Sequence, residues 1–403
     1  MGGSAPAIRG PWPAGINNRA NEKAIPTGAV RDSVNFDPSA DGVMHLRSGF
    51  DLVVPGENIR GALGIGDHVL IADGTKLIDF NESTGSTAQL ASIAGSGRFV
   101  GDVLNDELFF CTENQSFRYK NGALRPWGVP TVTLQPVPTL GAGSLAAGSY
   151  QCAATFIDAH GDEGGTTEAL IIDVPANSSL GFILPSPPDG GKVRLYVSSV
   201  NGGTPYLQYE GVGAYICSVV MDSGARLDTQ FLREPVTGDS ITAHNGVLVI
   251  AAGSTLHMTL PMRPHLRSAM TGFFQFSKPI DMVMSCDGGI YLAADKTFFL
   301  TAIETPEPVS TKVLDFGAVR GSGARGIKKE AVWMTRYGVA MSDGQGGATL
   351  ISEANFVPEL ASSGSSGVLE HNGNQLVVTT MHDPKGPNPL AASDYYEAEI
   401  FTP

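Results

Sequence analysis

The sequence lacks several features that would assign a function class at once. It has only four cysteines among 403 residues, and no two form a Cys-x-x-Cys pair. We therefore expect neither a disulfide framework nor a zinc site, and the isolated thiols are typical of buried strand residues. No apolar run reaches the roughly 20 residues that cross a bilayer, and the first residues lack the apolar core of a secretory signal. These absences predict a soluble protein made in a reducing cytoplasm, with no membrane anchor.

Positive charge is also scarce. The chain has 26 Lys and Arg against 40 Asp and Glu, for a formal charge of −14. A protein that reads nucleic-acid sequence normally carries a basic surface, so the charge disfavours that class. An acidic lining is still compatible with a passive conduit, because it would keep a polyanion from adhering.

Catalytic signatures are missing as well. The segment "GSGARG" (321–326) matches a dinucleotide fingerprint, but the residues after it alternate like a strand rather than opening a helix. Among 40 acidic residues, adjacent charges such as Asp162 with Glu163, or Asp315 near Arg320, carry no signal by themselves. Three further aspartates occupy expected turns and strand edges: Asp281, Asp287 and Asp295. We expect no enzyme activity, no catalytic residue, no metal site and no cofactor, and the sequence defines no binding residues.

Glycine (50) and proline (26) are abundant, making about a fifth of the chain, where roughly an eighth is usual. With 42% hydrophobic residues the chain is not disordered, so many turns must join short apolar strands. The stretch "VLIADGTKLIDF" (69–80) is an example, because its Asp73-Gly74 pair between apolar runs predicts a tight hairpin. Asp73 and Asp79 serve this hairpin in our interpretation, and the composition as a whole predicts an all-β protein.

The hairpin recurs along the chain. Similar turns are expected at Glu113, Gly253, Asp295 and Tyr337, and the run around Met381 keeps only the first half of the pattern. Successive turns are 40, 140, 42, 42 and 44 residues apart, so one spacing equals the period plus about 100 residues. A period of about 40–45 with several strands per unit is typical of β-propeller blades. We predict a propeller of about six blades; evenly spaced hairpins of a β-sandwich are the alternative.

Polar turns open several of these units and contain three histidines, His68, His244 and His371. A metal-ligand set is one interpretation. Two of the units lack a histidine, so recurring turn chemistry explains the pattern better.

The interruption between the second and third units follows the proline-rich "RPWGVP" (125–130). About 80 residues with six or seven expected strands predict a small sandwich. The stretch resembles a fibronectin type III domain in "SYQCAATFID", "PPDGGKVRLYVSS" and "YLQYE". The predicted organisation is an N-terminal arm that closes the ring (1–50), blades one and two (51–128), the inserted domain (129–211) and the remaining blades (212–403).

The N-terminal arm is polar and is expected to be extended. Pairing should begin near Val34 and Phe36, followed by a turn at Asp41-Gly42. A propeller commonly closes when one terminus supplies a strand to the blade built by the other. The arm and "YYEAEIFTP" (395–403) are candidates for that closure.

Taken in order, these segments resemble the β-propeller tail nozzle proteins of short-tailed bacteriophages, also called packaged-DNA stabilisation or tail accessory proteins. The arm reads "LRSGF" where a more basic segment would be expected, which leaves Arg47 alone. The residues that carry the resemblance are "GINNRANEKAIPTGAVRDSVNFD", "LRSGF", "HVLIADGTKLIDF", "ITAHNGVLVIAAGSTLHMTLPMRP", "FFQFSKPIDMVMSCDGGIYLAADKTFFLTA" and "TKVLDFGAVRGSG".

The resemblance implies a structural virion protein, assembled in the host cytoplasm, that forms a hexameric ring in the phage tail. Its expected partners are further copies of the chain, the portal and adaptor, and tail spike or needle proteins. The ring would retain packaged DNA and conduct it without sequence-specific binding. The alternative is a carbohydrate- or receptor-binding propeller adhesin, which would need exposed aromatics grouped on one face; the three tryptophans are Trp12, Trp127 and Trp333.

Overall fold

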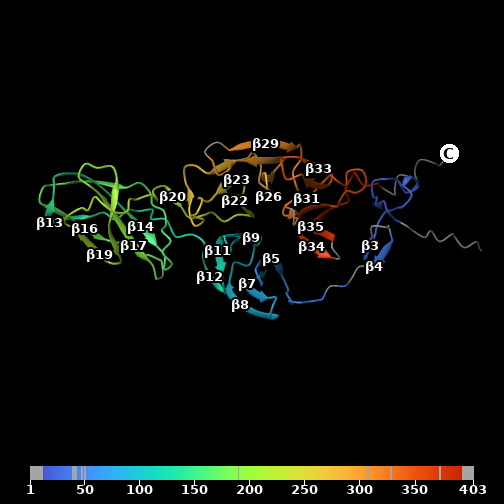
Figure 1. The fold of residues 1–403 in the computed structure, drawn as a ribbon, viewed down its shortest axis with the longest axis horizontal. Helices are drawn as coiled ribbons and strands as arrows, with labels where there is room; N and C mark the ends of the chain where they lie inside the picture. Colours follow the sequence, from blue (N-terminus) through green and yellow to red (C-terminus); the bar gives the residue numbers. More distant parts are fainter. Residues whose placement is uncertain are drawn as a thin grey trace, which may run out of the picture. The chain divides into compact units, whose positions relative to one another are not determined.

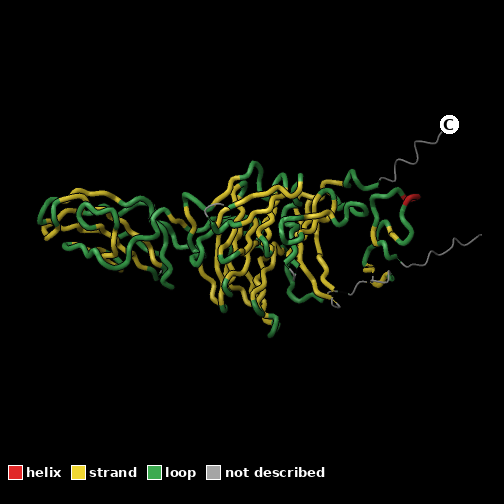
Figure 2. Tube along the Cα trace, turned by 45° about the horizontal axis from the view of Figure 1, so that its top comes forward, coloured by secondary structure: helices red, strands yellow, loops and turns green. Residues whose placement is uncertain are grey.

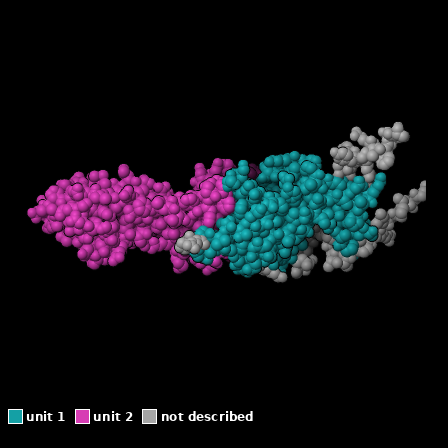
Figure 3. All heavy atoms as spheres, turned by 90° about the horizontal axis from the view of Figure 1, so that it is seen from above, with its two compact units in different colours: residues 1–55, 277–403 teal, residues 56–276 magenta. Residues whose placement is uncertain are grey.

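The computed structural model describes residues 12–38, 43–46, 49, 51–188, 190–305, 308–326, 329–371 and 374–392. Within them the chain is built of β-strands and loops, and the helical content is one 3-10 turn, η1 (Glu22–Ala24) (Figures 1 and 2). The expectation of an all-β protein is confirmed. The chain divides into two compact units, residues 56–276 and residues 1–55 with 277–403 (Figure 3).

Five antiparallel sheets of four strands carry the repeat. In each, the strands follow one another as a meander, and three sheets belong to residues 56–276 and two to the other unit. In residues 56–276 the strands of these sheets are β5 (Ile59–Ile65), β6 (His68–Asp73), β7 (Lys76–Asn81) and β8 (Ser86–Ser92); β9 (Val100–Leu104), β10 (Glu107–Thr112), β11 (Gln115–Lys120) and β12 (Ala123–Pro126); β21 (Ser240–His244), β22 (Val247–Ala252), β23 (Thr255–Met258) and β25 (Phe273–Gln275). In the other unit they are β26 (Met282–Cys286), β27 (Gly289–Ala293), β28 (Thr297–Thr301) and β29 (Val309–Leu314); β30 (Ala324–Arg325), β31 (Ala331–Thr335), β32 (Gly338–Ser342) and β33 (Ala348–Leu350).

The turn residues explain why the chain reverses where it does. Asn105 and Asp106, between β9 and β10, both have positive φ (53° and 57°), as a two-residue hairpin with the twist of the strands requires. All five expected hairpin turns, at Asp73-Gly74, Glu113, Gly253, Asp295 and Tyr337, lie between the second and third strands of these sheets. The predicted repeat is therefore present as a repeated four-stranded sheet.

The second strand is buried on both faces in four of the five sheets (β6, β10, β22 and β27), because side chains alternate across a strand and both sets are apolar. On β10, Leu108 and Phe110 pack with the core of the β5–β8 sheet, whereas Phe109 and Cys111 pack with Leu248 and Ile250 of β22. The three sheets of this unit are thus stacked face to face in chain order. In the other unit, Tyr291 of β27 and Trp333 of β31 share a core in the same way.

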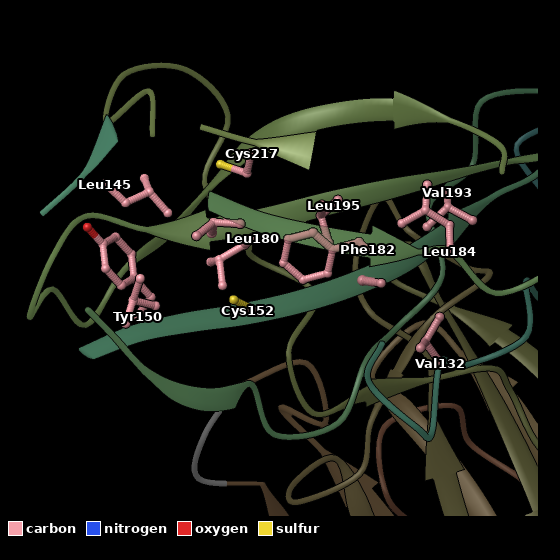
Figure 4. Packing of buried hydrophobic residues seen from close by; sticks show 13 residues of the cluster. Val132, Leu145, Tyr150, Cys152, Leu180, Phe182, Leu184, Val193, Leu195 and Cys217 are labelled. Carbon is pink, nitrogen blue, oxygen red and sulfur yellow. The ribbon is translucent and has the colours of Figure 1, made fainter. Parts of the chain in front are cut away.

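The interruption is a two-sheet sandwich. One sheet has the order β13-β16-β19 and the other β15-β14-β17-β18. Both contribute to one core, in which Cys152 and Leu195 of one sheet face Leu180, Phe182 and Cys217 of the other (Figure 4). The strands are β13 (Thr139–Leu145), β14 (Gly148–Ile157), β15 (Leu170–Val174), β16 (Ser178–Ile183), β17 (Lys192–Ser198), β18 (Pro205–Gly211) and β19 (Ala214–Cys217).

The predicted end of this domain at residue 211 is wrong. β19 pairs with β16, and Cys217 is fully buried opposite Leu180. Gly213, at φ 86°, forms a turn inside the sandwich rather than a linker after it. The last strand therefore belongs to the insert.

The last repeat unit departs from the expected pattern. It is a two-stranded ribbon of β34 (Leu360–His371) and β35 (Asn374–Gly386). The turn expected at Met381 is wrong, because Met381 lies within β35 and pairs with Gly364. Ser and Thr residues continue the ladder on both strands, so nothing breaks the pairing at that point.

The N-terminal segment is paired earlier than expected. β1 (Gly15–Ile16) lies parallel to β2 (Ala29–Val30), and β3 (Phe36–Pro38) pairs with β4 (Met44–Leu46). Val34 is in no strand and is 69% exposed. The Asp41-Gly42 turn, Arg47 and residues 395–403 lie outside the described residues.

This segment is also not a free arm. The Asn18 side chain donates to the Val357 carbonyl (2.8 Å) and accepts from the Val357 amide (3.0 Å). The Ala392 amide donates to the Asn18 carbonyl (2.9 Å), and Arg31 donates to the Ala392 carbonyl (2.8 Å). These bonds fix residues 17–31 to two segments near the other end of the described chain.

Candidate functional site

The richest polar site surrounds the loop that joins β14 to β15, residues 158–169. Thr166 lies between two connecting segments and forms isolated parallel bridges with Val132 and Gln230. Gly165 lies so close to a neighbouring backbone that a Cβ there would be 1.8 Å from the Leu232 carbonyl oxygen. Glycine is therefore required at 165, and the loop joins the sandwich to the sheets of its own unit through the main chain.

Asp158 shapes the first half of this loop. Its carboxylate accepts hydrogen bonds from the amides of His160 and Asp162, both at 2.9 Å. Gly161 supplies the positive φ (90°) that the turn needs. This turn directs the Asp162 carboxylate towards β11.

Arg118 of β11 meets this loop with a guanidinium that is only 3% exposed. Nη2 donates to the Asp162 carboxylate, with Asp158 Oδ2 at 3.4 Å. Arg125 of β12 approaches the same Asp162 at 3.5 Å and bonds Glu107 of β10 at 3.0 Å. Two arginines and three carboxylates thus form one network between the β9–β12 sheet and the sandwich.

The charges set the proton affinities of the network. Burial alone would raise the pKa of Asp162, but the hydrogen bond and charge of Arg118, with His265 and Arg125, lower it below its ordinary value. Burial lowers the pKa of His265, against the nearby Asp162 charge. Asp162 is therefore ionised and His265 neutral at pH 7.

Glu163 carries the network into the sandwich. Its carboxylate accepts from Thr155 Oγ1 (2.6 Å) and the Tyr196 hydroxyl (2.7 Å), and it pairs with Arg194 at 2.6 Å. Arg194 also pairs with Glu210 at 3.0 Å. Burial and the Glu163 charge raise the pKa of Tyr196, so the hydroxyl stays a donor at any ordinary pH.

A cavity of about 200 Å³ adjoins the network. Asp162, Glu163, Thr229 and His265 are among its lining residues. His265 Nδ1 is 3.7 Å from Asp162 Oδ1, which is too long for a hydrogen bond, and the other Asp162 oxygen is held by the arginines. The geometry therefore favours Asp162 as an ion-pair partner over Asp162 as the orienting acid of a general base.

Similar polar ties link neighbouring sheets elsewhere in this unit. Asp79 of β7 accepts from the Tyr119 hydroxyl of β11 (2.8 Å) and lies 2.9 Å from His68 Nδ1. Asp102 of β9 accepts from the Ala243 amide of β21 at 2.8 Å. These groups connect successive sheets of the stack, so Asp79 stabilises more than its own hairpin.

The other singled-out residues are dispersed. His68 begins β6, whereas His244 ends β21. The side chain of His371 lies outside the described residues. Among the residues that are described, no three potential metal ligands lie together. Asp315 pairs with Lys312 (2.5 Å), whereas the charge beside Arg320 is Asp281. Asp287 pairs with Lys329 at 2.8 Å. The four cysteines are buried free thiols: Cys111, Cys152, Cys217 and Cys286.

The "GSGARG" segment contains strand β30, and no helix follows it among the described residues. Ser322 within it is 1% exposed; its hydroxyl donates to the Val319 carbonyl (2.7 Å) and accepts from the Met334 amide (3.0 Å). These bonds connect the segment to β31, so its role is structural. In the described part of the chain, no helix is long and apolar enough to cross a bilayer.

Sequence reasoning discounted Asp162 and Glu163 and missed their partners Arg118, Arg125 and His265. One local signal was available. Arg118 interrupts an aromatic run between Phe117 and Tyr119, and a charged residue in a buried strand needs a partner.

No protein-family model matches the chain, and no curated protein sequence matches it. Among solved structures, the N-terminal domain of Nup159 is 11% identical with a TM-score of 0.31, covering 79% of this chain and 72% of that one. BBS1N in complex with ARL6DN is 13% identical with a TM-score of 0.32, covering 84% of this chain and 97% of that one. The extracellular domain of a putative hybrid two component system from B. thetaiotaomicron is 11% identical with a TM-score of 0.32, covering 80% of this chain but only 37% of that one. Similarities this low carry no argument about function.

Proposed function

We propose that the chain is a structural virion protein, the tail nozzle of a short-tailed double-stranded DNA phage. In this proposal about six blades form a propeller, the insert is a fibronectin-III-like domain, and six copies assemble into a ring. The ring retains packaged DNA and conducts it on infection, in contact with the portal, the adaptor and tail spike or needle proteins. The role is scaffolding and not catalysis.

The observation that carries this proposal is the buried network around Arg118. A flexible binding module would be joined by an exposed linker, whereas here the insert is held by two arginines, three carboxylates and a glycine-dependent backbone contact. A rigidly held insert suits a part that must keep a fixed position in an assembly. Seven strands in sheets of three and four support the fibronectin-III-like assignment.

The stacked sheets support the propeller. Five meanders of four strands pack face to face within their units, and residues 17–31 are bonded to segments 353–357 and 392. The joining of early and late segments is the kind of contact that closes a propeller. The net charge of −14 suits a lumen along which DNA slides without adhering.

The burial of tryptophan disfavours the adhesin alternative. Trp127 and Trp333 are 0% and 1% exposed, and the Trp127 indole donates to the Pro264 carbonyl at 2.7 Å. Neither can form the exposed aromatic platform that a sugar-binding face needs. Of the three tryptophans, only Trp12 is partly exposed.

The test is the mass of the purified full-length chain, alone and with a portal–adaptor complex. We expect six copies per particle, at least when the complex is present. A chain that stays monomeric under both conditions and binds glycans on an array would contradict the proposal.

A further inference from the structure

A second cavity of this unit has an unusual charge. It measures about 270 Å³, and it is lined by Thr166, Thr167, Phe231, Arg233, Arg267, Ala269 and Met270. Arg233 and Arg267 lie directly opposite each other in the small sheet of β20 (Leu232–Arg233) and β24 (Arg267–Ser268). Like charges at opposed positions of a strand pair repel each other, so this pair costs stability in the free chain.

Among the described residues, neither arginine forms an ion pair with a carboxylate. The Arg233 side chain has no hydrogen bond to a described residue, and the Arg267 side chain donates only to the carbonyls of Glu234 (3.2 Å) and Ser268 (3.5 Å). The nearest acid, Glu234, accepts a bond from Thr131 instead. Burial and the Arg233 charge lower the pKa of Arg267, and the opposing charge of Glu234 offsets this only in part.

The rim of this cavity is apolar and partly strained. Phe231 has φ 61° although it has a large side chain, and its ring is 46% exposed. The backbone holds it there, because its amide donates to the Thr166 carbonyl (2.8 Å) and its carbonyl accepts from the Ala269 amide (3.0 Å). Such strain persists where the surroundings fix it and is concentrated at functional sites. Met270 on the same rim is 71% exposed.

These features define the chemistry of a ligand. Two guanidinium groups match carboxylate or phosphate oxygens, and the exposed Phe and Met beside them match an apolar or aromatic neighbour of that anion. In duplex DNA the bases are stacked inside, away from the phosphates, and a long polyanion is repelled by the charge of −14 more strongly than a short acidic peptide. An acidic peptide with bulky side chains fits better than DNA.

The sequence contains such a peptide after Ala392. Residues 393–403, "SDYYEAEIFTP", carry three carboxylates, three aromatic rings and no Lys or Arg. The bonds that join Ala392 to Asn18 and Arg31 are made without this stretch.

We infer that the Arg233–Arg267 cavity binds the acidic, aromatic segment 393–403 of a second copy of this chain. The inference rests on the proposed assembly and adds a contact between its subunits. In a ring with head-to-tail interfaces, the segment of each copy binds the cavity of one neighbour, and the cavity of each copy binds the segment of the other neighbour, so every cavity is occupied.

Binding of a labelled peptide of residues 393–403, acetylated and amidated, tests this. The receptor is the full-length chain with Asp394→Asn, Glu397→Gln and Glu399→Gln, so that its own segment does not compete. Adding Arg233→Gln and Arg267→Gln should weaken binding about tenfold or more, because the charge-assisted hydrogen bonds to the carboxylates of the peptide are lost. Arg226→Gln is the matched control, since Arg226 lies over the Tyr206 ring and not in this cavity, and it should change nothing.

Absence of peptide binding, or equal binding by the double arginine variant, would overturn the inference. So would a DNA duplex that binds through the two arginines when the peptide does not. Mixing two full-length variants, one with the three substitutions in its segment and one with the two arginine substitutions, should give a mixed complex. If the peptide binds but no mixed complex forms, the segment binds within its own chain and the contact between copies is refuted. An arginine-dependent peptide contact in a chain that never forms rings would refute the proposed function and leave the recognition of the segment standing.

Discussion

Arg118 is a charged residue whose side chain is buried. Its guanidinium is 3% exposed, and Asp158, Asp162 and Glu107 lie around it with side-chain exposures of 20%, 28% and 13%. Removing water from such groups is costly, so the network adds little net stability compared with an apolar core of the same volume. Its contribution is geometric, because Asp158 and Asp162 of the loop are held beside the Arg118 and Arg125 guanidinium groups.

Arg118→Met should therefore destabilise the unit of residues 56–276 by about 3–5 kcal/mol, because the carboxylates lose their buried cation. Urea unfolding measures the loss. Lys329→Gln removes an ion pair whose side chains are 62% and 61% exposed, and it should cost under about 0.5 kcal/mol. Adding Asp162→Asn to Arg118→Met should recover part of the loss; no recovery would mean that the charge network is not its cause.

His265 should make stability fall with acid. Its pKa in the folded chain is lowered by burial below the ordinary value of 6.5, so the unfolded chain takes up the proton first as the pH falls. The stability is complete above about pH 7 and declines as the pH falls through 6.5 towards the folded pKa. His265→Gln should flatten the free energy of unfolding between pH 7.5 and 5.5, with a residual slope from His257, whose pKa is also lowered by burial. An unchanged slope would show that His265 is not buried in its neutral form.

The sequence alone could not predict which charged residues meet at this site. Arg118 is 40 and 44 residues from Asp158 and Asp162, and His265 is a further hundred residues along the chain. Local pattern identifies charged residues but not which of 40 acids meets which base. Only the packing of the β14–β15 loop against β11 brings them together.

At the scale of elements, the loop of residues 158–169 is fixed by close backbone contacts. Gly164 and Gly165 are both buried, and a Cβ on Gly164 would be 2.8 Å from the Pro130 carbonyl oxygen. The loop therefore approaches two connecting segments, near 130 and 232, more closely than any side chain would permit. This approach sets the position of the sandwich.

Gly165→Ala should destabilise the unit by about 3 kcal/mol, since either the loop or the Leu232 backbone must move. Gly203→Ala is the matched control, because its Cβ would meet no atom within 4 Å, and it should be close to neutral. Circular dichroism during thermal unfolding compares the two. Equal melting temperatures would show that the loop adapts without cost.

Elements were predictable wherever the signal was local. Turn residues at Asp73-Gly74 and Glu113 place the hairpins correctly, because Gly and polar residues relieve the backbone at a reversal. β19 was missed because a strand of four residues after two glycines has no pattern of its own, and its burial depends on pairing with β16. Met381 was misplaced because the length of β35 is set by its partner β34.

At the scale of the whole molecule, early and late parts of the sequence share one unit. Asn17 is 4% exposed, and Asn18 bonds the Val357 amide and carbonyl. A closed repeat protein needs such a contact, because a sheet at the end of an open stack leaves an apolar face in water. The spacing of the turns predicts about six blades, whereas closure of the blades and assembly of copies depend on packing that no single turn encodes.

Asn18→Ala should destabilise the unit of residues 1–55 and 277–403 by about 1–3 kcal/mol, because two side-chain bonds are lost and the Val357 groups remain unsatisfied. Hydrogen exchange should quicken at residues 353–357 and not in the sandwich. Faster exchange across the sandwich instead would contradict the local role of Asn18.

Electron microscopy of the purified full-length chain, with and without a portal–adaptor complex, shows whether copies assemble into a ring. We expect rings of six copies around an open centre, with the two-sheet insert at the same position in every copy. Particles that remain single copies under both conditions, or inserts that vary in position from copy to copy, would contradict it.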